Sequence, residues 1–425
     1  MEKIPTSFSL ILMIIIPLLS FQEAFSQVVE GKDYSSRVNV DHTFDMAGED
    51  IFGQRFPSEN FTYQDKVTGV TINALTTSRH SSSKMYQTHP QWTSDGKYIV
   101  FTSNRTSREN GDRQFYAVSM DNYEIVQITT GSDNGNFHLG WKSGNAYLVK
   151  GQNIIELDLD QLLSDSEEDN VGEPAEYEKI IAKIPDTISP SGIGLDAEET
   201  SVYFSTKIEK HRSAIYKTDF KSGNTIKLKE VPFRIGHLQA NPYVSGEIMY
   251  CWETGGDSPQ RIWYLTVNND GSVKNRPLFE ESDSDWVTHE VFMGPDHILF
   301  NVMGHLDRLR KNKTGIFSLN IRTGNLEYHG QTNGGGYWHS NGTPEGNWIS
   351  GDTFDGKLYR LNASDTTDVT LLSQGHRLLS KSPFTGEAHL HQSVSPDGKW
   401  VLINSSYFTE NDIMLVPLHP ANSED

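Results

Sequence analysis

The stretch SPDGKWVLI, residues 395–403, joins a tight-turn signal to a run of β-branched and aromatic residues. Asp-Gly supplies the positive φ that a short hairpin needs, and the residues after it favour a half-buried strand. The same combination recurs along the chain. Its other instances are SDGKYIVF at Ser94, KSGNAYLV at Lys142, AEETSVYF at Ala197, VSGEIMY at Val244, GPDHILF at Gly294 and PEGNWIS at Pro344.

The spacing of these turns predicts the architecture. Their centres fall near residues 96, 144, 199, 246, 295, 346 and 398, so about 50 residues separate successive turns. That interval suits one four-stranded blade of a β-propeller. A second apolar strand follows each turn, as in RIWYLTV at Arg261 and GIFSLNI at Gly315. The sequence therefore predicts an all-β fold, a seven-bladed β-propeller.

The two ends of the repeat region predict how the ring closes. The chain stops soon after DIMLVPL (412–418), which leaves the last blade one strand short. The segment TGVTINALT (68–76) precedes the first repeat and reads as the missing strand. Pairing of the N-terminal and C-terminal strands would close the propeller and remove its exposed edges.

The N-terminus predicts export, to the periplasm or the exterior. Lys3, the apolar run SLILMIIIPLLSF (9–21) and small residues at Ala24 and Ser26 are typical of a signal peptide over 1–26. A membrane anchor is the alternative, disfavoured because the run is short and contains Pro17. No later run is long enough to span a bilayer, so we expect no membrane span after signal removal. A lead-in segment over 27–55 and the propeller over 56–425 complete the organisation.

The charge composition of the chain limits the kinds of ligand that it can bind. The net charge is −20, which argues against nucleic acid, because phosphate binding needs a basic surface. An anionic ligand would need a local positive centre, from Arg, Lys or a metal. The lone Cys251 excludes an internal disulfide and, within EIMYCW, is expected to be buried. The acidic stretch 160–178 is expected to be a solvated loop, and the sequence sets no oligomeric state.

Histidines recur at the inner-strand segments, which a propeller brings to one central channel. They are His89, His138, His237, His289, His339, His389 and His391. In the pair His389 and His391, residues i and i+2 of a strand share a face, so both imidazoles can bind one ion. His289 occupies a comparable place two blades earlier and would be the third ligand. The alternative is a set of histidines on a solvated face, and Glu290 is expected to form a structural salt bridge.

His237, in FRIGHLQANP, is the candidate catalytic base, and Arg212, in KHRSAIYKTDF, is the candidate catalytic arginine. An arginine beside a histidine can bind a carboxylate and keep the imidazole neutral and able to accept a proton. The alternative for both is structural, with Arg212 a surface residue and His237 a hydrogen-bonded loop residue.

Nearly the whole mature chain resembles the oligogalacturonate lyases, seven-bladed propeller enzymes that cleave pectin fragments. The matching motifs come in the same order along the chain. They are FPSE at Phe56, DKVTGVTINALT at Asp65, YQTHPQWTSDGKYIVFTSNR at Tyr86, IVQIT at Ile125, IGHLQANP at Ile235, ETGGDSPQRIW at Glu253, THEVF at Thr288, SGDTFDGKLY at Ser350 and HLHQSVSPDGKWVLINSS at His389.

The resemblance implies a divalent cation, typically manganese (Mn²⁺), held by His289, His389 and His391. The family's glutamine ligand falls on Gly386, so water, a substrate carboxylate, Glu387 or Gln392 would replace it. It further implies that His237 is the base, with Arg212 beside it, in the β-elimination of an anionic uronate oligosaccharide. The export signal is a departure, because familiar members act inside the cell.

The sequence leaves two alternative functions open. A non-catalytic periplasmic scaffold resembling the TolB-type propellers would share the turns but need no histidine cluster. A glycoside hydrolase would need two carboxylates about 5–10 Å apart, for which Glu253 and Asp352 are the candidates.

Overall fold

The structure is a computed structural model that describes residues 28–29, 32–33, 51–78, 80–106, 113–131, 135–268, 270–377 and 388–420. The predicted signal peptide and most of the predicted lead-in segment lie outside these residues. Among the residues described, no helix is long and apolar enough to cross a membrane.

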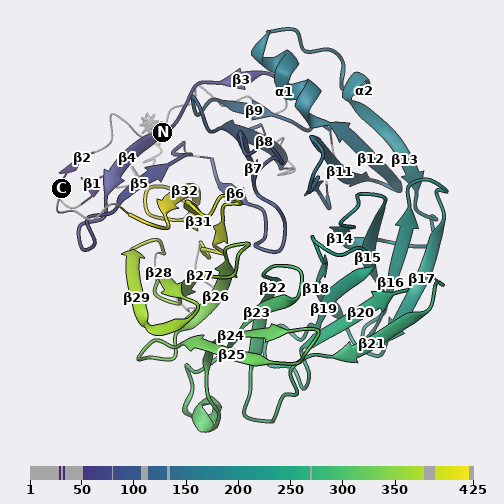
Figure 1. Cartoon of the computed structure of the whole chain (residues 1–425). Helices are drawn as coiled ribbons and strands as arrows, with labels where there is room; N and C mark the ends of the chain where they lie inside the picture. Colours follow the sequence, from purple (N-terminus) through teal and green to yellow (C-terminus); the bar gives the residue numbers. More distant parts are fainter. Residues whose placement is uncertain are drawn as a thin grey trace, which may run out of the picture.

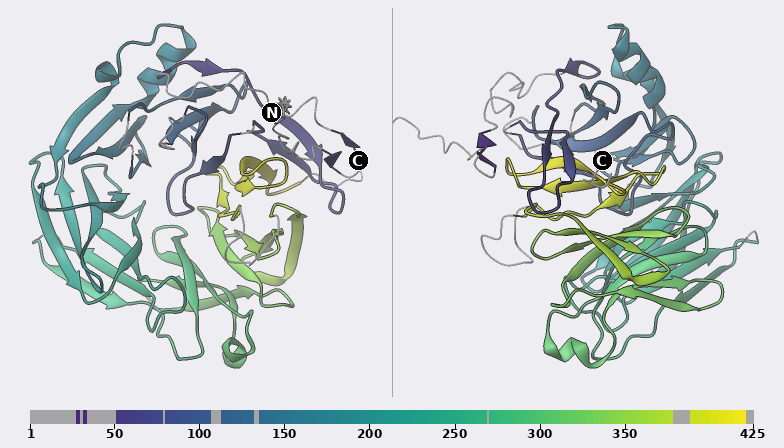
Figure 2. Two further views of the ribbon diagram at one scale, coloured as in Figure 1. Left: turned by 180° about the vertical axis from the view of Figure 1, so that it is seen from behind. Right: turned by 60° about the vertical axis from the view of Figure 1, so that its left-hand side comes forward.

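Seven antiparallel sheets surround a central axis, which confirms the seven-bladed propeller (Figure 1). Figure 2 shows the same ring from behind and from one side. The sheets succeed one another around the ring in chain order, because each turn-and-strand repeat supplies one sheet of consecutive hairpins. A separate hairpin of β1 (Val28–Val29) and β2 (Lys32–Asp33) precedes the ring.

In blades two to six, the first strand of each blade in chain order lies nearest the channel, and in blade one the strand Ser82–Lys84 has this place. Blades one to three comprise β6 (Ser82–Lys84), β7 (Tyr98–Ser103), β8 (Gln114–Ser119) and β9 (Ile125–Gln127); β10 (His138–Leu139), β11 (Asn145–Lys150), β12 (Asn153–Asp158) and β13 (Glu178–Lys183); and β14 (Ser191–Leu195), β15 (Ser201–Glu209), β16 (Arg212–Asp219) and β17 (Thr225–Val231). Blades four to six comprise β18 (Ile235–Ala240), β19 (Glu247–Trp252), β20 (Ile262–Val267) and β21 (Val273–Pro277); β22 (Val287–Phe292), β23 (His297–Val302), β24 (Gly315–Asn320) and β25 (Leu326–Gly330); and β26 (Tyr337–Gly342), β27 (Trp348–Thr353), β28 (Leu358–Asn362) and β29 (Asp365–Ser373). A short 3₁₀ helix, Asp307–Lys311, connects β23 to β24.

The seventh blade closes the ring with strands from both ends of the chain. It comprises β30 (Ser393–Val394), β31 (Trp400–Ser405), β32 (Asp412–Pro417), β5 (Thr71–Ala74) and β4 (Phe61–Gln64). β5 pairs with β32 and lies within the predicted segment 68–76, so the predicted closure is confirmed. The fully buried residues Ile72 and Met414 pack in its core.

A buried ion pair joins the closing segment to blade one. Arg105 Nη1 lies 2.7 Å from Glu59 Oε1, and neither side chain is exposed. The other oxygen of Glu59 accepts hydrogen bonds from the backbone N–H groups of Thr77 and Ser78. Nearby, β3 (Arg55–Phe56) pairs with β9 as an extra outer strand of the first blade. The chain before β4 is therefore fixed to blade one while β4 and β5 belong to blade seven.

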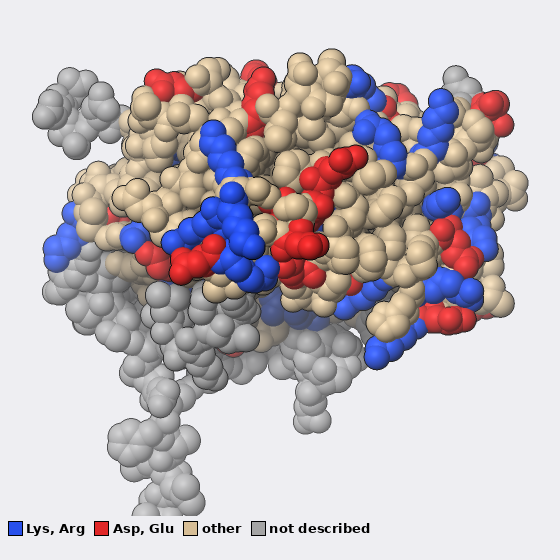
Figure 3. Space-filling model, turned by 90° about the horizontal axis from the view of Figure 1, so that it is seen from below, with Lys and Arg blue, Asp and Glu red and all other residues tan. Residues whose placement is uncertain are grey.

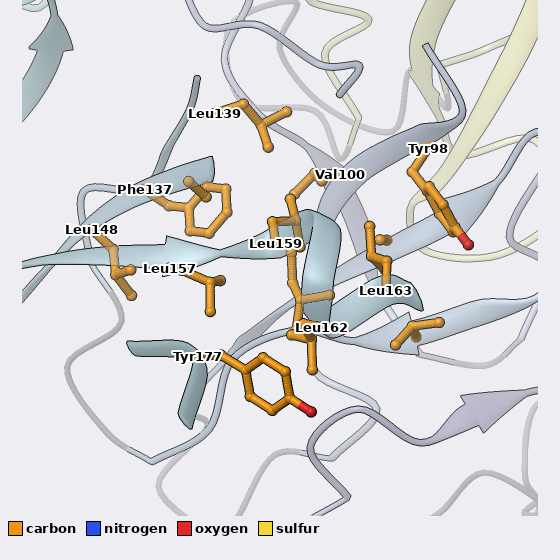
Figure 4. Packing of buried hydrophobic residues seen from close by; sticks show 14 of the residues in the cluster. Tyr98, Val100, Phe137, Leu139, Leu148, Leu157, Leu159, Leu162, Leu163 and Tyr177 are labelled. Atoms are coloured by element: carbon orange, nitrogen blue, oxygen red, sulfur yellow. The ribbon is translucent and has the colours of Figure 1, made fainter. Parts of the chain in front are cut away.

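The prediction of a solvated loop over 160–178 is wrong, because this stretch contains two helices. They are α1 (Leu159–Glu167) and α2 (Pro174–Tyr177). Leu159, Leu162 and Leu163 share one face of α1 and are buried against Phe52 and Tyr177 (Figure 4). The acidic residues occupy the other faces, so three apolar residues at helical spacing outweighed the acidic composition.

Replacing Asp158 by alanine is expected to lower the free energy of unfolding by about 1 kcal/mol. The Asp158 carboxylate caps α1 by accepting a hydrogen bond from the backbone N–H of Gln161. Urea unfolding would measure the change, and Asp158→Asn, which keeps an oxygen at the cap, is the matched control. Equal stability of all three proteins would show that the cap contributes nothing.

Cys251 is fully buried on β19, as expected. On the face seen from below, acidic and basic side chains lie beside one another rather than in separate regions (Figure 3). Charges of opposite sign therefore offset one another locally on this face.

Candidate active site

Three inner strands carry one extra residue at a histidine. In β18, Gly236 pairs with Cys251 and Gln239 with Met249, so three steps along one strand match two along the other. The registers of β22 and β26 shift in the same way, between Thr288 and Val291 and between Tyr337 and Ser340. Such bulges bend a strand and redirect its side chains. The affected histidines are His237, His289 and His339.

Three of the site histidines have left-handed backbone conformations. The φ angles are +46° at His237, +57° at His289 and +44° at His391. This conformation costs a residue with a Cβ roughly 1–2 kcal/mol, so the surrounding packing must hold it. His391 precedes β30, so the pair His389 and His391 is not part of a regular strand. The two imidazoles approach one another through local backbone strain, not through the strand alternation that the sequence suggested.

Five of the seven channel histidines gather in one row. Ring centroids are 6.3 Å apart for His237 and His289, and 4.0 Å for His289 and His339. They are 4.4 Å apart for His339 and His391, and 5.3 Å for His391 and His389. His89 and His138 form a separate pair with centroids 5.1 Å apart. The row brings together residues from blades four, five, six and seven.

His339, His389 and His391 form the group best arranged to hold a metal ion. One ring nitrogen from each lies within 4.8 Å of the others. The Nδ1 of His339 donates to the buried carboxylate of Asp352, at 2.8 and 3.0 Å from its two oxygens. Within the described residues, no hydrogen-bond partner reaches the buried Nε2 of His339. A carboxylate that orients a histidine whose other nitrogen is free is typical of metal sites, so these residues fit a divalent cation.

The expected ligand His289 lies beside this group and is not one of the three mutually close residues. Its Nδ1 donates to the backbone carbonyl of Trp338, 2.6 Å away, which leaves Nε2 with its lone pair. Burial, together with the neighbouring His339 and Arg261, lowers the pKa of His289 well below its usual value. His289 therefore lies between the three-histidine group and His237, and its place as a metal ligand stays a prediction.

Of the protein residues that could supply a fourth metal ligand, the structure describes Gln392 alone. Gly386 and Glu387 lie outside the described residues. Gln392 is buried, and its Nε2 donates to the carbonyl oxygens of His339 and Ser350 at 2.8 and 3.3 Å. Within the described part of the chain, its Oε1 is buried without a hydrogen-bond partner. The Gln392 amide thus braces the inner strand that carries His339.

The Nδ1 atom of His237 has three polar neighbours. It lies 3.4 Å from the Tyr86 hydroxyl, 3.2 Å from Arg261 Nη2 and 3.6 Å from Glu290 Oε1. The Nε2 atom lies 3.9 Å from Glu253 Oε2. A quarter of the side chain remains exposed. One edge of the imidazole is therefore held by protein groups while the ring stays accessible.

Arg261 and Glu290 form a buried ion pair beside His237. Arg261 Nε donates to Glu290 Oε2 at 3.0 Å, and the two side chains are 4% and 0% exposed. Burial alone would raise the pKa of Glu290, but the guanidinium of Arg261 and the contact with His237 hold it well below its usual range. Glu290 thus forms the salt bridge that the sequence suggested, yet it does so inside the site, because the bulge in β22 turns it inward.

The expected pairing of Arg212 with His237 is wrong. The Arg212 side chain is 44% exposed at the start of β16, where its guanidinium contacts Glu209 at 2.9 Å and Glu230 at 3.4 Å. Arg261 is the arginine that contacts the imidazole. A role for Arg212 in binding substrate stays a prediction.

A cavity of about 240 Å³ opens on this cluster. His237, His289 and Arg261 line it, together with Trp286 and Trp338. Charged and imidazole groups together with flat apolar rings suit an anionic sugar, which has a carboxylate and an apolar C–H face.

The sequence pattern did not single out Tyr86 or Arg261, nor did it place His339 in the three-histidine group. A signal existed for His339, because it precedes Pro344 by the same interval that separates His391 from Pro396. Arg261 lies in QRIW at the entry to an otherwise apolar strand, which is unusual for an arginine. Tyr86 offered no comparable signal.

Comparisons with known proteins agree with this architecture. The sequence profile of the oligogalacturonate lyases matches residues 51–307. No curated protein matches the sequence. An oligogalacturonate lyase solved in complex with manganese is similar in structure, with 18% identity, a TM-score of 0.71, and coverage of 88% of this chain and 99% of the other. An oligogalacturonate lyase from Vibrio parahaemolyticus has 18% identity and a TM-score of 0.69, over 86% of this chain and 98% of the other.

At that identity the solved structures establish the propeller fold. The family profile adds the sequence evidence, since it covers more than half of the chain and includes both His237 and His289. This chain belongs to the oligogalacturonate lyase family.

Proposed function

We propose that this protein is a metal-dependent lyase that cleaves oligogalacturonate, or a related uronate oligosaccharide, by β-elimination. The observation that carries the proposal is the juxtaposition of a three-histidine group with His237, in a chain of this family. His289 bridges the two, with ring centroids 4.0 Å from His339 and 6.3 Å from His237. The N-terminal sequence supports export as part of the same proposal.

His339, His389 and His391 would hold the cation, for which manganese is the candidate because a similar solved structure contains it. When bound, a divalent cation supplies a local positive charge that stabilises negative charge on the sugar carboxylate. The cation would thereby offset the repulsion between an anionic substrate and a chain of net charge −20.

The reaction breaks the C5–H bond and the C4–O4 bond and forms a C4=C5 double bond. His237 takes the C5 proton, and the electron pair of the C5–H bond becomes the new double bond. The leaving oxygen acquires a proton, so that a new chain end and an unsaturated uronate result. Glu290, 3.6 Å from Nδ1, stabilises the imidazolium that forms, and Arg261 keeps Glu290 ionised. Trp286 and Trp338 line the cavity where the sugar ring would lie.

A glycoside hydrolase built on Glu253 and Asp352 is disfavoured. Asp352 is fully buried and is committed to His339 through its side chain. The carboxylate that orients His339 is not accessible to a glycosidic bond.

The test is the ultraviolet absorbance of the unsaturated uronate, measured on digalacturonate, longer pectic fragments and other uronate glycans. Absorbance should rise with time, stop after exhaustive chelation and return when Mn²⁺ is added back. Activity that survives chelation would refute the metal mechanism. Absence of the signal on every polyuronate would favour a scaffold resembling the TolB-type propellers.

Asp352→Asn is expected to weaken metal binding about 10–100-fold, because the neutral amide no longer fixes and polarises the His339 ring. Competition with a coloured chelator would measure the affinity. Asp355→Asn is the control, since Asp355 is exposed and pairs with Lys357. Equal metal affinity in the two variants would remove His339 from the ligand set.

A further inference from the structure

The segment 389–391, which carries two of the three mutually close histidines, lies outside the regular sheet of blade seven. The site histidines of blades four, five and six each lie within an inner strand, namely β18, β22 and β26. The corresponding strand of blade seven, β30, begins only at Ser393, where its pairing with β31 starts opposite Leu402. The backbone carbonyls of residues 389–391 therefore need hydrogen-bond donors other than those of a regular strand ladder.

Two residues, which we call the clamp, supply these donors. The backbone N–H of Asn404 donates to the Leu390 carbonyl at 3.0 Å, and its Nδ2 donates to the His389 carbonyl at 3.1 Å. Lys84 Nζ donates to the His391 carbonyl at 2.5 Å. Asn404 lies on β31 of blade seven, whereas Lys84 lies on β6 of blade one, 307 positions from His391 in the chain. All three carbonyls are thus held by donors at the junction of the first and last blades.

The two residues of the clamp are bonded to one another and are buried. The backbone N–H of Lys84 donates to Asn404 Oδ1 at 3.0 Å, and Lys84 Nζ also donates to the Met85 carbonyl at 2.8 Å. Lys84 and Asn404 are only 5% and 6% exposed. Because little water reaches these groups, removal of one donor would leave a carbonyl without a replacement partner, which is unfavourable.

The clamp acts where the backbone is strained. His391 has a φ of +44°, a conformation that a residue with a Cβ rarely adopts unless its surroundings hold it. The bond from Lys84 holds the carbonyl of this same residue and so opposes rotation of its backbone. The imidazoles of His389 and His391 both belong to the three-histidine group. The directions of both rings therefore depend on a backbone segment that the clamp keeps in place.

We propose that Lys84 and Asn404 are positioning residues for the metal site, which hold residues 389–391 in the conformation that presents both imidazoles to one cation before it binds. This inference rests on the proposed function, because it takes His389 and His391 as metal ligands. Neither residue of the clamp is among the described residues that line the cavity at His237, so both act through the backbone of the ligands. Ligands that are already ordered bind more tightly, because binding then costs less conformational entropy.

The first test measures Mn²⁺ affinity of the full chain by calorimetry. Lys84→Met removes the donor to the His391 carbonyl and keeps an apolar side chain of similar length, and we expect it to weaken Mn²⁺ binding about tenfold. Asn404→Asp keeps the oxygen that accepts from the Lys84 backbone but loses the side-chain donor, and it should weaken binding similarly. Lys150→Met is the matched control, since Lys150 is a partly buried lysine of blade two whose ion pair with Glu178 lies outside the clamp.

The second test needs no metal. The backbone amide of Asn404 bonds the Leu390 carbonyl, so its hydrogen exchange reports whether the segment stays in place. In the metal-free protein this exchange should be faster in Lys84→Met than in the wild type or Lys150→Met, because the segment is then held at fewer points. Mass spectrometry of peptides that contain residue 404 would measure it.

The outcomes separate this inference from the proposed function. Faster exchange and weaker Mn²⁺ binding in Lys84→Met, with Lys150→Met unchanged, would support the clamp. Wild-type Mn²⁺ affinity in both Lys84→Met and Asn404→Asp, or exchange that Lys84→Met leaves unchanged, would overturn the clamp and leave the proposed function intact. A wild-type protein that binds no Mn²⁺ would refute the metal site itself, and the proposed function together with it.

Discussion

Replacing His237 by alanine is expected to lower kcat on digalacturonate by about 10²–10⁴-fold, the usual contribution of a positioned general base. Among the described residues, His237 is the imidazole that contacts both Arg261 and Glu290. The Nδ1 of His289 is committed to the Trp338 carbonyl. His339, His389 and His391 are the candidate metal ligands. The rate of formation of the unsaturated uronate, measured at saturating substrate, gives the effect.

Two further measurements make this result specific to a proton-transfer role. Metal content should be unchanged in His237→Ala, because His237 is not one of the three mutually close histidines. His419→Ala is the control, since His419 is an exposed histidine that contacts Arg360 at 3.2 Å. A His237→Ala protein with wild-type kcat and intact metal would remove His237 as the base.

Arg261→Met is expected to lower the free energy of unfolding by about 3–5 kcal/mol, because it leaves Glu290 buried without its partner. The pair is inaccessible to water, with side chains 4% and 0% exposed, so solvent cannot replace the lost guanidinium. Arg261 also lies 3.6 Å from Glu253, which would lose a neighbour of opposite charge. Urea unfolding at neutral pH would measure the loss.

The pH dependence of this loss has a definite sign. The pKa of Glu290 is depressed in the folded protein, so the stability that its ionised form provides is present above the unfolded carboxyl pKa. That contribution is lost as the pH falls through the folded pKa. The difference in stability between wild type and Arg261→Met should therefore be largest at neutral pH and should shrink in acid. A difference that grows in acid would contradict the ion-pair explanation.

A double variant separates stability from chemistry. Arg261→Met combined with Glu290→Leu removes both buried charges and should recover much of the lost stability, as replacement of buried ion pairs by apolar residues often does. The same protein should stay catalytically impaired, because His237 then lacks the carboxylate that stabilises its protonated form. Recovery of both stability and full activity would show that the pair has a structural role only.

The sequence alone determined the ring and several of the histidines that converge on its channel. Turns about 50 residues apart repeat seven times, and only a propeller places such units side by side around one axis. The segment 68–76 could be assigned to the last blade, because an unpaired strand edge must be covered. The convergence of His237, His289, His389 and His391 followed from the same topology, since inner strands of every blade face one channel.

The tertiary structure alone decided which of these residues face one another. Sequence spacing fixes a position along a strand but not the direction of a side chain once a bulge adds a residue, as at His289 and His339. Arg261 rather than Arg212 reaches His237, because burial beside Glu290 holds its guanidinium there while Arg212 stays at the surface. The sequence repeat determines which inner strands line the channel. The strained backbone and the buried hydrogen bonds determine which side chains contact one another there, and both depend on residues that are far apart in the chain.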